Sequence, residues 1–102
     1  MPNFSEDQWG GNKWMAIDIN PADPIYLVPI LIHLSSLYHF SIPKLIDTLD
    51  GYVAEFEIIG SKTIVFLDNY TLSIAFEKIS VRDQILTALR SLPENYFDQK
   101  SK

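Results

Sequence analysis

Hydrophobic and polar residues in the first third of the chain predict a strand followed by a long helix. After its initial lysine, the segment 13–19 carries one polar side chain, Asp18, which is typical of a strand covered on both faces. The turn that follows ends in Asp23 and Pro24, which suit the N-cap and the first position of a helix. We expect this helix over residues 24–38. Its apolar side chains lie on nearly every side, as in a helix deep in a core.

Pro29 interrupts this predicted helix. It lacks the N–H group that would pair with the carbonyl of Ile25, and it disfavours helical geometry at Val28. The helix therefore either kinks at this point or begins near Pro29.

A second, short helix is expected after the first. Ser41 and Pro43 suit its first turn, and Asp50 with Gly51 suits its C-terminal end because glycine readily adopts a left-handed conformation. Its apolar stripe comprises Leu45, Ile46 and Leu49.

From Tyr52 onward the apolar period changes from helical to alternating, which predicts strands. We expect three of them, over residues 52–59, 63–67 and 71–78. The turns between them are short enough for hairpins, so the strands should form an antiparallel meander.

A final helix is predicted after the meander. Ser80 and Asp83 have the spacing of a capping box, and Pro93 ends the helical pattern. Beyond it, Tyr96 and Phe97 are the apolar residues that could dock back onto the core.

The predicted elements follow the order β-α-α-β-β-β-α in a single domain, residues 13–97. The helical segment between the first strand and the meander spans roughly 30 residues, which is enough to permit parallel pairing. We therefore expect an α+β fold with a four-stranded mixed sheet and helices packed on it. Residues 1–12 are expected to form a loose N-terminal arm and residues 98–102 a disordered tail.

Composition narrows the classes of function. The 13 acidic residues outnumber the 8 basic ones, giving a net charge of -5, so nucleic acids and anionic membranes are not expected partners. The chain has no cysteine, which excludes disulfides and thiolate chemistry. It has no signal-like N-terminal segment and no apolar run long enough for a bilayer, so we expect a cytoplasmic protein.

Candidate catalytic residues are few. His33 and His39 would point roughly 120° apart on a helix, which disfavours a shared metal ion. We interpret His33 as a hydrogen-bonded core residue. No nucleotide-binding, calcium-binding or metalloprotease motif is present. We accordingly expect a binding protein rather than an enzyme, with no cofactor and no metal.

Four acidic residues near the middle of the chain form the candidate binding site. They have no basic residue among them in the sequence, and one nearby aromatic residue could serve as an anchor. One interpretation is an ordinary solvated face. The other is a recognition patch that steers a basic partner toward the chain. The site residues are Asp47, Asp50, Tyr52, Glu55 and Glu57.

In general layout the whole chain resembles small bacterial immunity proteins of contact-dependent inhibition and related polymorphic toxin systems. The acidic residues from Asp47 to Glu57, the lack of cysteine and the α/β layout carry this resemblance. It implies tight one-to-one binding to a cognate basic toxin domain, for example a nuclease, with no cofactor.

Two other classes remain open. A dimeric secretion chaperone is also small and acidic, and it would expose large apolar patches. A small-molecule-binding domain or enzyme would use His33 or Asp18 in a pocket. The sequence leaves open whether the protein is a monomer or a dimer.

Overall fold

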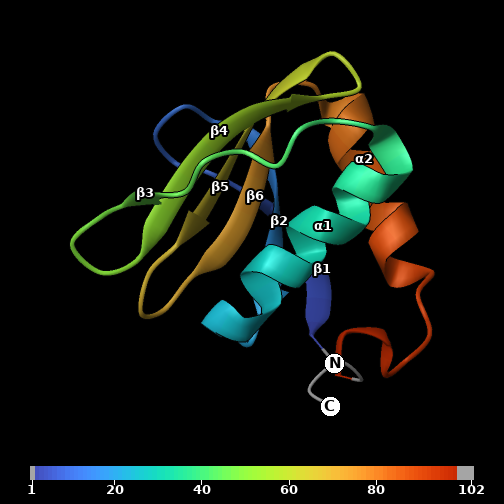
Figure 1. Cartoon of the computed structure of the whole chain (residues 1–102). Helices are drawn as coiled ribbons and strands as arrows, with labels where there is room; N and C mark the ends of the chain where they lie inside the picture. The colour runs from blue at the N-terminus through green and yellow to red at the C-terminus, as the bar shows by residue number, and fades with distance from the viewer. Residues whose placement is uncertain (1, 99–102) are drawn as a thin grey trace.

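A twisted antiparallel sheet carries the fold in the computed structural model, which describes residues 2–98 (Figure 1). In this range the chain forms six strands and two α-helices, an α+β architecture as expected. The strands lie in the order β1-β2-β6-β5-β4-β3. Their bounds are β1 Asn3–Gln8, β2 Met15–Asn20, β3 Ile46–Asp47, β4 Tyr52–Ile58, β5 Ser61–Leu67 and β6 Leu72–Phe76.

The N-terminal arm expected over residues 1–12 was a wrong prediction for most of its length. Residues 3–8 form the edge strand β1, which pairs with β2 so that Phe4 lies opposite Ile19. Five of the six side chains in this strand are polar and exposed, and Phe4 alone is buried. An edge strand with a single core side chain has no alternating pattern, and the sequence therefore gave no strand signal.

The expectation of a four-stranded mixed sheet was also wrong, because residues 2–98 form a six-stranded sheet in which every strand pair is antiparallel. After the first helix the chain crosses to the far edge of the sheet and enters it at β3. The meander then runs back toward β2, and β6 arrives antiparallel to it, with Ile17 opposite Ile74. The meander itself was predicted correctly.

The second helix expected over residues 41–51 does not form. The segment is extended, and Ile46–Asp47 pairs with the start of β4 as the two-residue strand β3. Phe40 stacks on Phe56 with ring centroids 4.9 Å apart, which holds the segment along β4. A short apolar run cannot be assigned to a helix or a strand by periodicity alone, and here contact with β4 decides it.

The first helix begins before Pro29. A short 3-10 turn, Pro24–Tyr26, leads into α1, Leu27–Tyr38, and the Asp23 carboxylate accepts the N–H of Ile25 at 3.0 Å. Pro29 falls in the first turn of α1, where a backbone N–H has no helical acceptor and its loss costs little.

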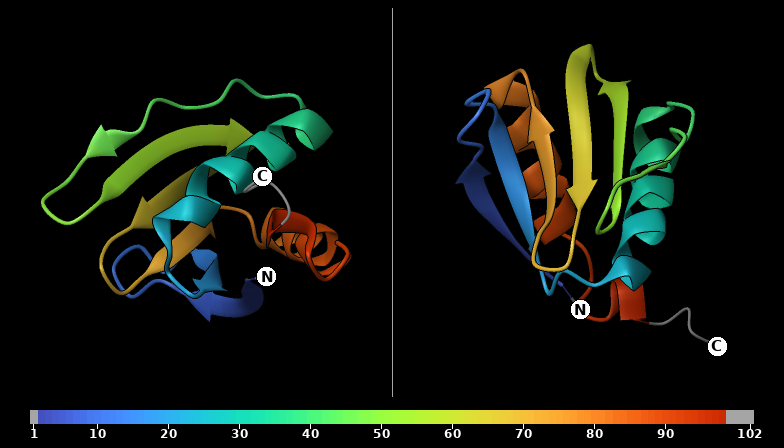
Figure 2. Two further views of the ribbon diagram at one scale, coloured as in Figure 1. Left: turned by 60° about the horizontal axis from the view of Figure 1, so that its bottom comes forward. Right: turned by 90° about the vertical axis from the view of Figure 1, so that its left-hand side faces the viewer.

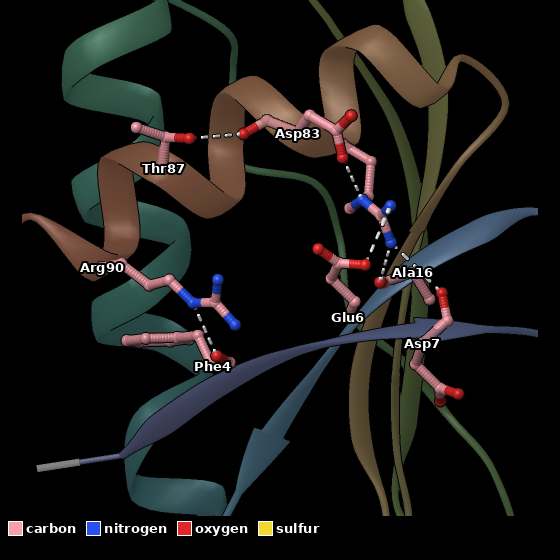
Figure 3. A network of polar contacts seen from close by, with 8 residues as sticks. Phe4, Glu6, Asp7, Ala16, Asp83, Thr87 and Arg90 are labelled. Atoms are coloured by element: carbon pink, nitrogen blue, oxygen red, sulfur yellow. Dashed lines mark hydrogen bonds and ion pairs between the residues drawn. The ribbon is translucent and has the colours of Figure 1, made fainter.

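The last helix, α2, spans Ile79–Arg90. Its N-cap is Lys78, and no side chain caps it, so the predicted capping box at Ser80 does not form. Two arginines fasten α2 to the edge of the sheet (Figure 3). Arg90 Nε donates to the carbonyl of Phe4 at 3.0 Å, and Arg82 Nη1 donates to the carbonyl of Ala16 at 3.0 Å.

Both helices cover the same face of the sheet, and the core lies between them and it (Figure 2). Cross-strand neighbours on this face are fully buried, among them Ile17, Ile74, Val65 and Ala54. Within residues 2–98, the opposite face carries no helix. Neither α-helix in residues 2–98 is long and apolar enough to cross a membrane.

The C-terminal segment docks on the helices, as predicted for Phe97. This residue is buried and makes edge-on contacts with Phe4 and His33. The turn Tyr96–Asp98 carries it. The tail predicted to be disordered lies outside the described residues, except for Asp98, which accepts a hydrogen bond from Tyr26 Oη at 3.2 Å.

Candidate functional site

A hollow of about 550 Å³ opens at one end of the sheet, where the β3–β4 hairpin and the β5–β6 turn lie next to each other (Figure 1). Three carboxylates line it, from Asp47, Asp50 and Asp68. Tyr52 and Asn69 also contribute, and the turn before α1 forms the remaining wall. We call this feature the acidic hollow.

The β3–β4 hairpin positions the first two carboxylates. The N–H of Thr48 donates to the carbonyl of Gly51 at 2.9 Å, and the N–H of Gly51 donates back to Thr48 Oγ1 at 3.0 Å. Gly51 is packed so tightly on the end of β5 that a Cβ there would overlap the carbonyl of Leu67. Glycine therefore allows the hairpin to lie against β5, which closes one side of the hollow.

The β5–β6 turn positions the third carboxylate. Asp68 Oδ1 accepts the N–H groups of Tyr70 at 2.8 Å and Thr71 at 2.7 Å, which fixes the side chain in the turn. Sequence reasoning treated Asp68 only as a turn residue. The signal that could have placed it near Asp50 is the register of the β4–β5 hairpin, in which Tyr52 lies opposite Leu67.

Two apolar side chains stand at the tips of the loops that form the hollow. Leu49, at the tip of the β3–β4 hairpin, is 98% exposed, and Tyr70, in the β5–β6 turn, is 88% exposed. A single exposed apolar side chain is ordinary on a protein surface. Here two of them belong to the loops that supply the acidic hollow's three carboxylates.

Among the described residues that line the acidic hollow, none is a lysine or arginine that would balance its carboxylates. In the part of the chain that the structure describes, no three acidic or histidine side chains are arranged to hold a metal ion. The arrangement instead suits a bulky organic cation such as an ammonium or guanidinium group, which carboxylates bind through charge-assisted hydrogen bonds.

The structure divides the candidate residues from the sequence into two groups. Asp47, Asp50 and Tyr52 line the acidic hollow. Glu55 and Glu57 are exposed on the helix-free side of β4. Glu57 lies directly opposite Lys62 in β5, so the four acids are not free of basic neighbours as the sequence suggested.

The helix-free face has a second, more apolar hollow of about 450 Å³ beside the β1–β2 loop. The indole Nε1 of Trp9 donates to Ser73 Oγ in β6 at 2.9 Å, and its ring meets Phe66 edge-on at 6.4 Å. The loop thus folds across the middle of this face. Its aromatic side chain helps to bury Ser73, which is otherwise without a covering helix.

His33 does not contribute to either hollow. It is half-buried on α1, and its Nδ1 lies 3.2 Å from Tyr96 Oη. Its Nε2 is buried without a hydrogen-bond partner among the described residues. Burial lowers the pKa of this imidazole, which favours its neutral form. Asp18, the other candidate for a ligand pocket, lies on the helix-free face of the sheet. Its cross-strand neighbour there is Ser73 in β6.

No protein-family model matches the chain, and comparison with curated proteins and with solved structures gives no significant match. The geometry of the site is therefore the basis for a functional proposal.

Proposed function

We propose that the chain is a protein-binding protein whose acidic hollow receives a lysine or arginine side chain of a basic partner. The observation that supports this best is that Asp47, Asp50 and Asp68 line one hollow, and that none of its described lining residues is basic. A guanidinium entering it could pair with one of these carboxylates through two parallel hydrogen bonds, and the other two would add to the attraction.

Leu49 and Tyr70 would provide the apolar part of the same interface. Interfaces draw most of their binding energy from a few large side chains, with tyrosine prominent among them, and charges beside these residues supply specificity. The net charge of -5 would attract a basic partner over a longer range and raise the association rate.

The specific form of this proposal is an immunity protein that neutralises a cognate toxin by one-to-one binding. A toxin that acts on nucleic acid presents basic side chains to its substrate, and an acidic inhibitor can occupy the same side chains. Such an inhibitor requires no cofactor and no catalytic residue.

The test is affinity capture from a lysate of the source organism with three baits in parallel. The first is the wild type. The second is Asp47→Asn/Asp50→Asn, which removes two charges from the acidic hollow, and the third is Glu55→Gln/Glu57→Gln, which removes two charges from the helix-free face. All three are washed at the same moderate salt concentration and analysed by mass spectrometry.

We expect one folded, basic protein in equal amount on the wild type and on the Glu55/Glu57 variant, and at least tenfold less on the Asp47/Asp50 variant. Loss of the partner only from the Glu55/Glu57 variant would move the site to the helix-free face. Equal retention on all three baits would contradict the role of the acidic hollow. For the immunity form, the purified partner must be toxic when expressed alone and inactive when mixed one-to-one with the chain.

A further inference from the structure

The outward side of α1 is apolar from the turn before the helix to Ile32. Ile25, in the turn before the helix, and Val28 and Ile32, within it, are spaced at i, i+3 and i+7, which places them on one line along the helix. Their exposed fractions are 66%, 44% and 54%. We call these three residues the outer stripe.

Only the inner side of α1 is covered by the fold. Leu27, Ile30, Leu31 and Leu34 face the core and are buried. A surface helix of a globular protein normally places polar residues on its outer side. In α2 these positions are occupied by exposed polar residues such as Gln84 and Thr87. The sequence pattern of α1 predicts burial on all sides, and the fold provides burial on one.

Charge indicates what could cover the outer stripe. Residues 24–43 contain no aspartate, glutamate, lysine or arginine, although the whole chain has a net charge of -5. A basic partner would find no opposite charge along the helix itself, because the acidic hollow lies beyond its N-terminal end, at Pro24. Two copies of the chain would repel each other through their acidic surfaces and would meet without repulsion at this uncharged one. An apolar stripe is also complementary to itself, as a two-fold interface requires.

We infer that the outer stripe is a homodimer interface, in which α1 packs against α1 of a second copy about a two-fold axis. Each stripe residue occurs twice in such a contact, so three side chains per chain supply six to the interface. The helix is about 18 Å long, and three side chains make an interface smaller than the roughly 800 Å² per partner of standard complexes. The dimer is thus expected to be weak, so that its population rises with protein concentration. This inference does not depend on the proposed function, because none of the three stripe residues lines the acidic hollow, which reaches this segment at Ala22 and Pro24, before the stripe begins.

The first test is the mass in solution by sedimentation velocity from about 5 to 500 μM. The wild type is expected to shift from 11.7 kDa toward twice that mass as concentration rises. Ile32→Glu places a charge on the stripe at an exposed position, so it should fold and remain a monomer throughout. Gln84→Glu adds the same charge on the exposed side of α2 and is expected to dimerise like the wild type.

A second test exploits the absence of cysteine in the chain. Val28→Cys introduces a single thiol in the outer stripe, and Gln84→Cys introduces one on α2. Under mild oxidation at 100 μM, we expect the first variant to form at least five times more disulfide-linked dimer than the second.

Either of two results would overturn the inference. One is a wild type that is folded by circular dichroism and monomeric at 500 μM. The other is a dimer that persists in Ile32→Glu or that cross-links equally through position 84, since a different surface would then form the contact.

Discussion

The guanidinium of Arg82 in α2 donates from Nη1 to the carbonyl oxygen of Ala16 in β2, 66 residues away in sequence and 3.0 Å away in space (Figure 3). The same nitrogen donates to the carbonyl of Asp7, the residue opposite Ala16 in β1, at 3.3 Å. Arg82 Nε pairs with the neighbouring Asp83 at 2.7 Å, and Glu6 lies 3.9 Å from its Nη2. Arg82 is 4% exposed and so ties the β1–β2 hairpin to α2 from a buried position.

Truncation of Arg82 is therefore predicted to destabilise the protein substantially. Arg82→Ala leaves a buried carbonyl without its donor and removes the packing of the long side chain, so we expect the free energy of unfolding to fall by about 2–4 kcal/mol. Arg90→Ala is the matched control, because Arg90 donates one bond to Phe4 from an exposed position. It should cost about 0.5–1.5 kcal/mol. Urea denaturation followed by circular dichroism measures both, and equal losses would contradict the special role of Arg82.

Gly51 is predicted to tolerate no side chain. In Gly51→Ala the new Cβ meets the backbone of Leu67 and Asp68, which cannot yield as a flexible side chain would. The hairpin must shift away from β5, with a loss of about 1–3 kcal/mol in the free energy of unfolding. Gly10→Ala has open space around its Cβ and should stay within about 0.5 kcal/mol of the wild type. Thermal and urea denaturation of the two variants measure both losses. Equal losses of unfolding free energy in Gly51→Ala and Gly10→Ala would show that the close contact of Gly51 with β5 is unimportant.

His33 is predicted to make stability depend on pH. Its folded-state pKa is lowered by burial from 6.5, so the unfolded chain binds a proton more readily than the folded one. Its contribution to stability is complete above about pH 6.5 and decreases as the pH falls through the window between 6.5 and the lowered folded value. Denaturation from pH 8 to 5 should show this decrease in the wild type and in His39→Gln, and a smaller one in His33→Gln. Identical profiles for all three proteins would exclude His33 as the cause.

The bond between Trp9 and Ser73 is predicted to hold the β1–β2 loop on the helix-free face. Trp9→Phe keeps an aromatic ring beside Phe66. It removes the indole N–H that donates to the hydroxyl of Ser73, a residue that is 1% exposed. We expect a loss of about 1–2 kcal/mol in the free energy of unfolding. A double-mutant cycle with Ser73→Ala isolates the bond itself, and a coupling energy of about 1 kcal/mol is the expected result. Additive effects of the two changes would mean that the loop is held in another way.

Local pattern was sufficient for the elements whose apolar residues recur with a regular period in the sequence. The meander of β4, β5 and β6 follows from period-two alternation and short turns, and α2 follows from its apolar stripe. The Asp23–Pro24 pair located the start of the first helical segment. Within the candidate site, local sequence placed Asp47, Asp50 and Tyr52 together because one hairpin carries all three.

Composition and periodicity thus determined the α+β class, the meander, the last helix and an acidic chain without thiol chemistry. Only the tertiary structure decided three further features. β1 and β3 are strands because a neighbouring strand offers its backbone groups to them, and this pairing leaves little trace in the side-chain pattern. Asp68 joins the acidic hollow because two loops meet at one end of the sheet. The outer stripe of α1 is exposed because helix periodicity records which residues are apolar, whereas the number of surfaces available to cover them depends on how the whole chain packs.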